Sequence, residues 1–262
     1  MPRFAANLSM MFPELEVPQR FQAARDAGFE AAEFLFPYTV PVADMRQWLD
    51  DAGLQLLLIN SPPGDYEAGE RGLAALPGRE GAFRESLDLA LDTATGLGAG
   101  MVHLMAGVVP AGVPAAACED VFIENLKVAT EAAKAKGVAL LLEPLNTRDV
   151  PGYLHTDTAH TRRIIEAVRS DNLFLQFDLY HMQIMQGDLV EGIRRDFDLI
   201  RHIQFSSVPG RHEPQHGEVA LPFVFDAIDA MGYTGWIGCE YAPKDDTLAG
   251  LSWGKPYGLG SS

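Results

Sequence analysis

The sequence predicts an α/β fold, a (β/α)8 or TIM barrel, formed by a single domain over residues 1–262. The first observation is that short apolar runs alternate with longer helical patterns along the whole chain. Such alternation predicts parallel strands joined by right-handed helical crossovers. The second is that about eight such units fit a chain near 250 residues, which is typical of this barrel. The third is that no linker-like stretch divides the chain, which favours one domain over two.

Eight segments have the short apolar pattern of buried strands. They are residues 4–8, 31–36, 55–59, 101–105, 138–142, 173–177, 202–205 and 236–239. Helical periodicity marks residues 18–27, 42–52, 83–96, 115–136, 158–169 and 221–231, and a weaker pattern lies near 188–194. Glycines follow several of these helices, at the position where a left-handed C-cap residue is favoured. The order of the segments therefore repeats strand and helix around the predicted barrel.

Charge and cysteine content exclude several classes of protein. Lys and Arg number 20 against 36 Asp and Glu, which gives a formal net charge of −16. An acidic surface repels phosphate backbones and anionic lipids, so we expect neither a nucleic-acid nor a membrane partner. The apolar runs are too short to span a bilayer, and the start lacks the apolar segment of a signal peptide. Because the two cysteines, Cys118 and Cys239, form no CxxC pair, we predict a cytoplasmic protein.

One connection is unusually long for a compact domain. Residues 60–82 read NSPPGDYEAGERGLAALPGREGA, with glycine and proline throughout and little periodicity. Loops of this length are usually functional when they carry no secondary structure of their own. We therefore predict that the third βα loop is a lid or wall over the barrel mouth. The alternative is a flexible surface insertion.

Polar side chains follow four consecutive predicted strands. Glu143 ends the fifth strand, Asp178 the sixth and Glu240 the eighth, and Gln204 lies within the seventh. The active site of such a barrel collects at the carboxyl ends of its strands. Each acid taken alone has a second interpretation, as a strand-end residue paired with Arg or Lys. Together they would repel one another, which indicates that a cation neutralises them.

The donor set indicates which cation and which chemistry. Oxygen ligands are those that Mg²⁺ or Mn²⁺ prefer, and the four residues include no His or Cys, so zinc is disfavoured. Glu143 and Glu240 would lie beside any ligand of that metal. Two carboxylates and a Lewis acid are what proton transfer through an enediolate requires. The pattern predicts an isomerase or epimerase that needs no nucleotide cofactor.

Two further residues lie on loops at the same mouth. His181 comes three residues after Asp178, and Arg211 comes seven after Gln204. Arg is suited to bidentate capture of a substrate carboxylate, so both residues are candidates for substrate binding. The alternatives are a structural histidine at His181 and pairing of Arg211 with the nearby Glu213.

Three other motifs are discounted. Residues 212–216 match HExxH, but Pro214 prevents the helix that a zinc protease motif needs. The glycine-rich residues 96–100 follow a helix and precede a strand, which is the reverse of the order in a dinucleotide loop. Cys239 is turned away from Glu240 by strand alternation, so we expect a small buried residue.

At these residues the sequence resembles the hydroxypyruvate isomerase family of xylose-isomerase-like barrels. The resemblance extends along the whole chain. It includes the motifs RFAANLSMMF, EFLFPY, PGDYEAGERGLAALPGRE, LLEPLN, QFDLYHMQ, HIQ, RHEP and GWIGCEY. It implies metal ligation by Glu143, Asp178, Gln204 and Glu240, with Glu143 and Glu240 as proton donor and acceptor. From related ketose epimerases it implies substrate binding by His181 and Arg211.

Two activities occur among the near neighbours in this family, and both act on small anionic hydroxy-oxo acids. One converts hydroxypyruvate to tartronate semialdehyde, and the other isomerises 2-oxo-tetronate to 3-oxo-tetronate. The motifs VHLMAGVVPAG and VPGRHEP are closer to the second activity, and EPLN and DVPGY to the first. Ser207 stands where hydroxypyruvate isomerases usually carry Asp. The signature is therefore mixed, and both substrates stay open at this point.

Three alternative functions share part of this pattern. A ketose 3-epimerase would use the same two glutamates on a longer, neutral sugar. An apurinic endonuclease shares the barrel superfamily but needs several zinc ions and a basic DNA groove, which a net charge of −16 disfavours. A non-catalytic binding barrel would leave the acid/base pair without use. The sequence leaves a homo-oligomer open.

Overall fold

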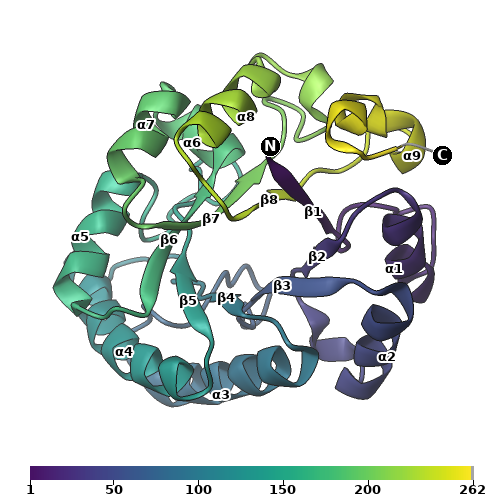
Figure 1. Ribbon diagram of the computed structural model, residues 1–262. Coiled ribbons are helices and arrows are strands. Elements are labelled where there is room, and N and C mark those ends of the chain that lie inside the picture. Colours follow the sequence, from purple (N-terminus) through teal and green to yellow (C-terminus); the bar gives the residue numbers. More distant parts are fainter. Residues whose placement is uncertain (261–262) are drawn as a thin grey trace.

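The structure, a computed structural model that describes residues 1–260, is a closed barrel of eight parallel strands in sequence order (Figure 1). The strands are β1 (Arg3–Asn7), β2 (Ala31–Phe34), β3 (Gln55–Asn60), β4 (Met101–His103), β5 (Ala139–Leu142), β6 (Leu173–Asp178), β7 (Ile200–Phe205) and β8 (Trp236–Cys239). β8 pairs with β1 and closes the ring. The predicted (β/α)8 fold is confirmed, and every predicted strand overlaps an observed one.

Helices form a ring outside the strands (Figure 1). They are α1 (Val17–Asp26), α2 (Val42–Ala52), α3 (Glu80–Leu97), α4 (Ala115–Ala135), α5 (Thr158–Val168), α6 (Leu179–Met185), α7 (Leu189–Asp196), α8 (Leu221–Ala230) and α9 (Thr247–Gly250). Three 3-10 helices, η1 (Pro37–Thr39), η2 (Pro214–His216) and η3 (Leu251–Tyr257), complete the set. Because α6 is short and begins directly after β6, it carries no amphipathic period, and the sequence did not predict it.

The inner face of the barrel changes from apolar to polar along the strands. At the amino-terminal end, Ala31, Leu57 and Leu141 belong to a small apolar cluster with Met101, Phe174 and Trp236 packed against it. Two residues further along these strands, alternation returns the chain to the inner face. Most of the residues there are polar, among them Glu33, His103, Glu143 and Gln176. The polar layer therefore lies toward the carboxyl ends, where barrel active sites are built.

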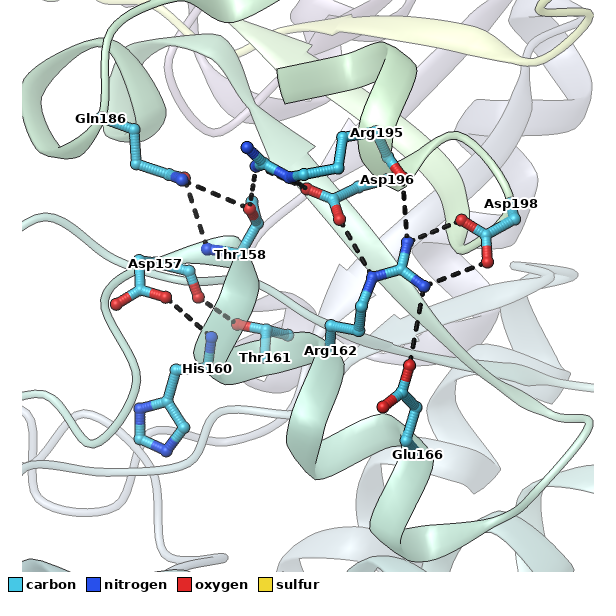
Figure 2. A network of polar contacts seen from close by, with 10 residues as sticks. All are labelled: Asp157, Thr158, His160, Thr161, Arg162, Glu166, Gln186, Arg195, Asp196 and Asp198. Atoms are coloured by element: carbon cyan, nitrogen blue, oxygen red, sulfur yellow. Dashed lines mark hydrogen bonds and ion pairs between the residues drawn. The ribbon is translucent and has the colours of Figure 1, made fainter. Parts of the chain in front are cut away.

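A polar network ties the outer helices together beside β7 (Figure 2). Arg162 of α5 donates to Asp196 at the end of α7 (Nε–Oδ1 3.1 Å) and forms an ion pair with Asp198 (Nη2–Oδ1 2.6 Å). Arg195 also donates to Asp196 (Nη2–Oδ2 2.8 Å). The Asp196 carboxylate is fully buried, so these two arginines supply the partners that a buried charge needs.

The connection between β3 and α3 folds over the carboxyl end of the barrel and is anchored there. Gly72 forms an isolated bridge with Ala106, and the Ala75 N–H donates to the Ala106 carbonyl (2.8 Å). Gly72 has a φ of +122°, and a Cβ on it would lie 2.3 Å from the carbonyl oxygen of Met105. Glycine is therefore required at the point where this connection crosses the loop after β4. Among residues 1–260, no helix is long and apolar enough to cross a membrane.

Candidate active site

Three carboxylates meet at the carboxyl ends of the strands. Asp178 is the last residue of β6, and Glu143 and Glu240 directly follow β5 and β8. We call these three residues the carboxylate cluster. All three are buried, and the Glu143 and Glu240 side chains line one pocket. The structure therefore brings together the three acids that the strand ends predicted.

Two carboxylate oxygens of the cluster have no hydrogen-bond partner in the described part of the chain. They are Oε1 of Glu143 and Oδ2 of Asp178. These oxygens lie 3.8 and 3.7 Å from Nε2 of His181, and Glu143, Asp178 and His181 can each offer one ligand atom within 4.8 Å of the other two. Buried carboxylate oxygens without a partner are costly unless an ion or ligand satisfies them. The geometry of the cluster therefore fits a metal ion.

His181 is oriented by a hydrogen bond from the main chain. The Asn146 N–H donates to Nδ1 of His181 (3.0 Å), so this nitrogen carries no proton. Burial lowers the pKa of His181 well below its ordinary value, and the Arg211 charge lowers it further. The neutral ring then holds its proton on Nε2, the atom that faces Glu143 and Asp178. His181 is thus placed to donate a hydrogen bond into the site from Nε2 rather than to offer a lone pair at that atom.

Arg211 lies against the carboxylate cluster. Its Nη2 is 3.1 Å from Oε2 of Glu240, and its guanidinium stands 5.0 Å from the ring of Tyr180. Arg211 has a left-handed backbone (φ +55°), and its N–H donates to the carbonyl of Ser207 (2.7 Å). Burial opposes its charge, but Glu240 and the other cluster acids outweigh burial and raise its pKa. Arg211 therefore pairs with Glu240, and the pairing with Glu213 considered from the sequence is not what the structure shows.

Burial and mutual repulsion raise the pKa values of the cluster. Burial raises the pKa of Glu240 to about 8, with Arg211 opposing the rise and Asp178 adding to it. The pKa of Glu143 is raised well above its ordinary value, first by burial and then by Glu240 and Asp178. The pKa of Asp178 is also raised by burial. A cation among these groups would lower all three values, because it favours their charged forms.

Gln204 lies beside Asp178, and both the nitrogen and the oxygen of its side-chain amide already form hydrogen bonds. The β6–β7 register pairs the two residues. The Gln204 Nε2 donates to Oε2 of Glu33 (2.8 Å), and its Oε1 accepts from Nε2 of Gln176. Glu33 also contacts Nε2 of His202, which lies two residues before Gln204 in β7. The predicted ligand Gln204 is therefore held rigidly, with one oxygen lone pair already used by Gln176.

Two residues of the site were not predicted from the sequence. Glu33 lies within β2, and His103 ends β4 with its Nδ1 3.1 Å from Oε2 of Glu143, without hydrogen-bond geometry. Burial lowers the pKa of His103 to about 3, so its ring is neutral. The signal that could have found them is a charged or titratable residue at an inward position of an otherwise apolar strand.

The pocket over the cluster is small. Its volume is about 120 Å³, and its lining includes Tyr66, Arg71, Asp149, His181 and Arg211. Clefts that hold drug-sized ligands are roughly 300–1,000 Å³, so this one suits a compact substrate. A larger hollow of about 490 Å³ lies at the opposite end of the barrel, lined by the first residues of several strands. That hollow has no carboxylate in its lining, so the chemistry belongs to the smaller pocket.

Comparison with known families agrees with the fold and the site. The family described as the Xylose isomerase-like TIM barrel matches residues 21–257. The chain therefore belongs to this family of barrels. A solved structure titled AP endonuclease, family 2, from Brucella melitensis superposes with a TM-score of 0.95 at 44% sequence identity, covering 98% of this chain and 99% of that one.

Full-length relatives define the group within the family. A 2-oxo-tetronate isomerase from Cupriavidus necator is 51% identical over 98% of this chain and 99% of its own length. The hydroxypyruvate isomerase of Escherichia coli is 39% identical over 98% of this chain and all of its own length. This protein is an isomerase of the hydroxypyruvate isomerase and 2-oxo-tetronate isomerase group, as the sequence motifs predicted.

Proposed function

We propose that this protein is an isomerase of the aldose–ketose type that moves the carbonyl group of a short hydroxy-oxo acid to the neighbouring carbon, with 2-oxo-tetronate the favoured substrate and hydroxypyruvate the second. The observation that carries the proposal is the pair Glu143 and Glu240, two buried carboxylates on one small pocket with raised pKa values. The identity of 51% to one 2-oxo-tetronate isomerase, against 45% to a putative human hydroxypyruvate isomerase and 39% to the Escherichia coli enzyme, supports the four-carbon acid.

The reaction moves the carbonyl group of the substrate to the neighbouring carbon. One glutamate removes a proton from the carbon that bears the hydroxyl group, and the C–H electron pair becomes the double bond of an enediolate. A proton is then delivered to the neighbouring carbon, while the hydroxyl proton passes to the former carbonyl oxygen. Electrons stay within the substrate, so no nucleotide cofactor is needed. A carboxylate whose pKa lies near the working pH both accepts and returns a proton efficiently, and burial supplies that shift for Glu143 and Glu240.

Two other side chains would hold the substrate oxygens. The Nε2–H of His181 points between Glu143 and Asp178. The buried Nε of Arg211 has no hydrogen-bond partner in residues 1–260 and so retains a free donor. Donors fixed in a buried site stabilise negative charge that develops on oxygen, because no reorganisation is needed during the reaction. We therefore assign substrate binding to His181 and Arg211.

We propose Mg²⁺ or Mn²⁺ as the cofactor. Glu143 and Asp178, which offer ligand atoms within 4.8 Å of each other, would hold it together with Glu240 of the same pocket, and Gln204 is the fourth candidate ligand, adjacent to Asp178. Oxygen donors favour these hard cations, and the protonated Nε2 of His181 disfavours zinc at this atom. When bound, the ion supplies Lewis-acid stabilisation of the developing oxyanion.

The test mixes the purified protein with 2-oxo-tetronate or hydroxypyruvate, in the presence of Mn²⁺ or Mg²⁺ in D₂O. We expect the isomerised acid, with deuterium at the carbon that receives a proton. Glu240→Gln and Glu143→Gln should each lose about 10²–10⁴-fold in kcat, the factor that a general acid or base typically contributes. Glu67→Gln, an exposed loop acid, is the matched control and should keep full activity.

Several outcomes would overturn the proposal. Unchanged turnover in Glu240→Gln, or full activity after complete metal removal, would contradict the mechanism. Faster turnover of fructose or psicose than of either acid would instead make the protein a ketose 3-epimerase. Cleavage of abasic DNA would support the endonuclease alternative, which the net charge of −16 disfavours. A cytoplasmic location remains part of the proposal, supported by the two cysteines, both buried and unpaired.

A further inference from the structure

The connection between β3 and α3 carries a second arginine into the pocket. Tyr66 and Arg71 belong to this connection and line the pocket together with Glu143, His181 and Glu240. Arg71 immediately precedes Gly72, whose close contact with the loop after β4 fixes the backbone at this point. Arg71 therefore occupies a defined place on the loop side of the active site.

The contacts of Arg71 hold its guanidinium without neutralising it. The guanidinium carbon stacks 3.6 Å from the centre of the Tyr66 ring. Its Nη1 donates to the carbonyl oxygens of Tyr66 (3.0 Å) and Glu70 (2.7 Å). In the described part of the chain it forms no ion pair, and its Nε and Nη2 form no hydrogen bond. Stacking and main-chain bonds pre-organise the side chain, and two donors stay available on one edge.

The other arginine of the pocket is differently engaged. Arg211 forms an ion pair with Glu240, and the cluster acids raise its pKa. The three carboxylates of the cluster balance the charge of one divalent cation and of Arg211 together. A substrate carboxylate bound there would gain no net attraction from them. Asp149, which also lines the pocket, adds a further negative charge. Arg71 is thus the cation of this lining whose charge is not yet balanced.

We propose that Arg71 binds the carboxylate of the substrate and selects acids over neutral sugars at this site. The inference rests on the proposed isomerase function and adds a residue to it. A planar guanidinium with two free N–H groups matches a carboxylate in a bidentate arrangement. The strongly acidic chain would then attract an anion through one arginine placed on the loop. This assignment also gives the connection a role in binding.

The kinetic test compares wild type with Arg71→Gln and Arg71→Lys, using 2-oxo-tetronate as substrate. We expect KM to rise about 10- to 100-fold in Arg71→Gln, the effect of a lost charge-assisted hydrogen bond, with kcat within about threefold. Arg71→Lys keeps the charge but loses the two parallel N–H donors of the guanidinium, so its KM should lie between those of wild type and Arg71→Gln. Arg84→Gln, an exposed arginine of α3 outside the pocket lining, controls for net charge and should match wild type.

Arg79→Gln controls for the order of the loop. It removes the ion pair with Glu70 (2.7 Å) but leaves Arg71 in place, so it should raise KM far less than Arg71→Gln. Erythrulose, which has CH₂OH where 2-oxo-tetronate has its carboxylate, should inhibit wild type and Arg71→Gln equally. The assignment would be overturned if the KM of Arg71→Gln stayed within twofold of wild type. It would also be overturned if Arg71→Gln weakened inhibition by erythrulose as much as it raised the KM for the acid.

A binding measurement separates this inference from the proposed function. Calorimetry with glycerate, a carboxylate that lacks a ketone and cannot isomerise, reports on Arg71 without catalysis. We expect Arg71→Gln to weaken glycerate binding by the same 10- to 100-fold, about the loss of one charge-assisted hydrogen bond. If the wild-type protein isomerises neither acid, the proposed function fails, and glycerate binding still decides the role of Arg71. If it isomerises them and glycerate binds both proteins equally, only the assignment of Arg71 fails.

Discussion

Substituting Gly238 by alanine tests whether the buried Glu33 carboxylate is fixed in place. Gly238 lies in β8 on the inner face of the barrel, next to Glu33 of β2. A Cβ on Gly238 would lie 2.0 Å from Oε1 and 2.6 Å from Cδ of Glu33, where an ordinary contact needs 3.4 Å. The carboxylate must therefore move by more than about 1 Å to admit a methyl group.

The neighbours of Glu33 resist that movement. Its oxygens accept from His202 Nε2, from Gln204 Nε2 (2.8 Å) and, at 3.5 Å, from Asn7 Nδ2, and all four side chains are buried. Losing one hydrogen bond to a buried charge costs about 1.5–3 kcal/mol, and overpacking adds about 1–3 kcal/mol. We expect Gly238→Ala to lower the free energy of unfolding by about 2.5–6 kcal/mol. For a domain of this size that corresponds to roughly 5–24 °C in Tm.

Urea denaturation and thermal melting followed by circular dichroism measure this loss. Gly100→Ala is the matched control, because a Cβ there would meet nothing within 4 Å, and it should stay within about 0.5 kcal/mol of wild type. In a Glu33→Ala background the added methyl finds space, so Gly238→Ala should cost less there than in wild type. A loss below about 1 kcal/mol for Gly238→Ala in the wild-type background would refute the reasoning, because it would mean that Glu33 moves freely.

Three further predictions concern stability and the metal. Arg162→Met takes one of two partners from the buried Asp196 and should lower the free energy of unfolding by about 1–3 kcal/mol in urea titrations, whereas the exposed Arg163→Met should change it little. Burial holds the pKa of His155 well below its ordinary value, so the unfolded chain takes up a proton first as pH falls below about 6.5 and stability falls with pH. By pH 5 this residue should lower the free energy of unfolding by about 2 kcal/mol. Urea titrations at pH 7, 6 and 5 should therefore show a smaller loss of stability in His155→Gln than in wild type. Equal dependence on pH in the two proteins would contradict this. Dialysis against EDTA should abolish isomerase activity, and Mn²⁺ or Mg²⁺ should restore activity and raise Tm, because an ion that binds only the folded state stabilises it.

Local sequence patterns were sufficient for the architecture. A strand buried on both faces is a short apolar run, and a helix covering it has a longer period, so each element leaves a mark in consecutive residues. The exceptions are short elements such as α6, which begins directly after Asp178 and spans too few residues for a period to appear. Glycines after helices fixed several ends, for example Gly53, which caps α2 in the left-handed conformation.

The carboxylate cluster was also predictable, for a geometric reason. Parallel strands of a closed barrel bring their carboxyl ends to one mouth, so acids at Glu143, Asp178 and Glu240 must converge. That inference needs only the strand boundaries and the fold class. Glu33 and His103 were missed because they stand within strands, where an inward polar residue has no visible partner in the sequence.

The amino-acid sequence by itself determined the barrel fold, the alternation of strands and helices along the chain, and the acids at the mouth of the barrel. Only the tertiary structure decided the pairing of those residues. Arg211 forms its ion pair with Glu240 and not with the nearby Glu213, and Glu33 contacts His202, 169 residues further along the chain. Likewise, the sequence placed Arg71 in a long loop but not in the pocket. Patterns in sequence report local periodicity and burial, whereas the partner of a charge depends on which segments the closed barrel brings within a few ångströms.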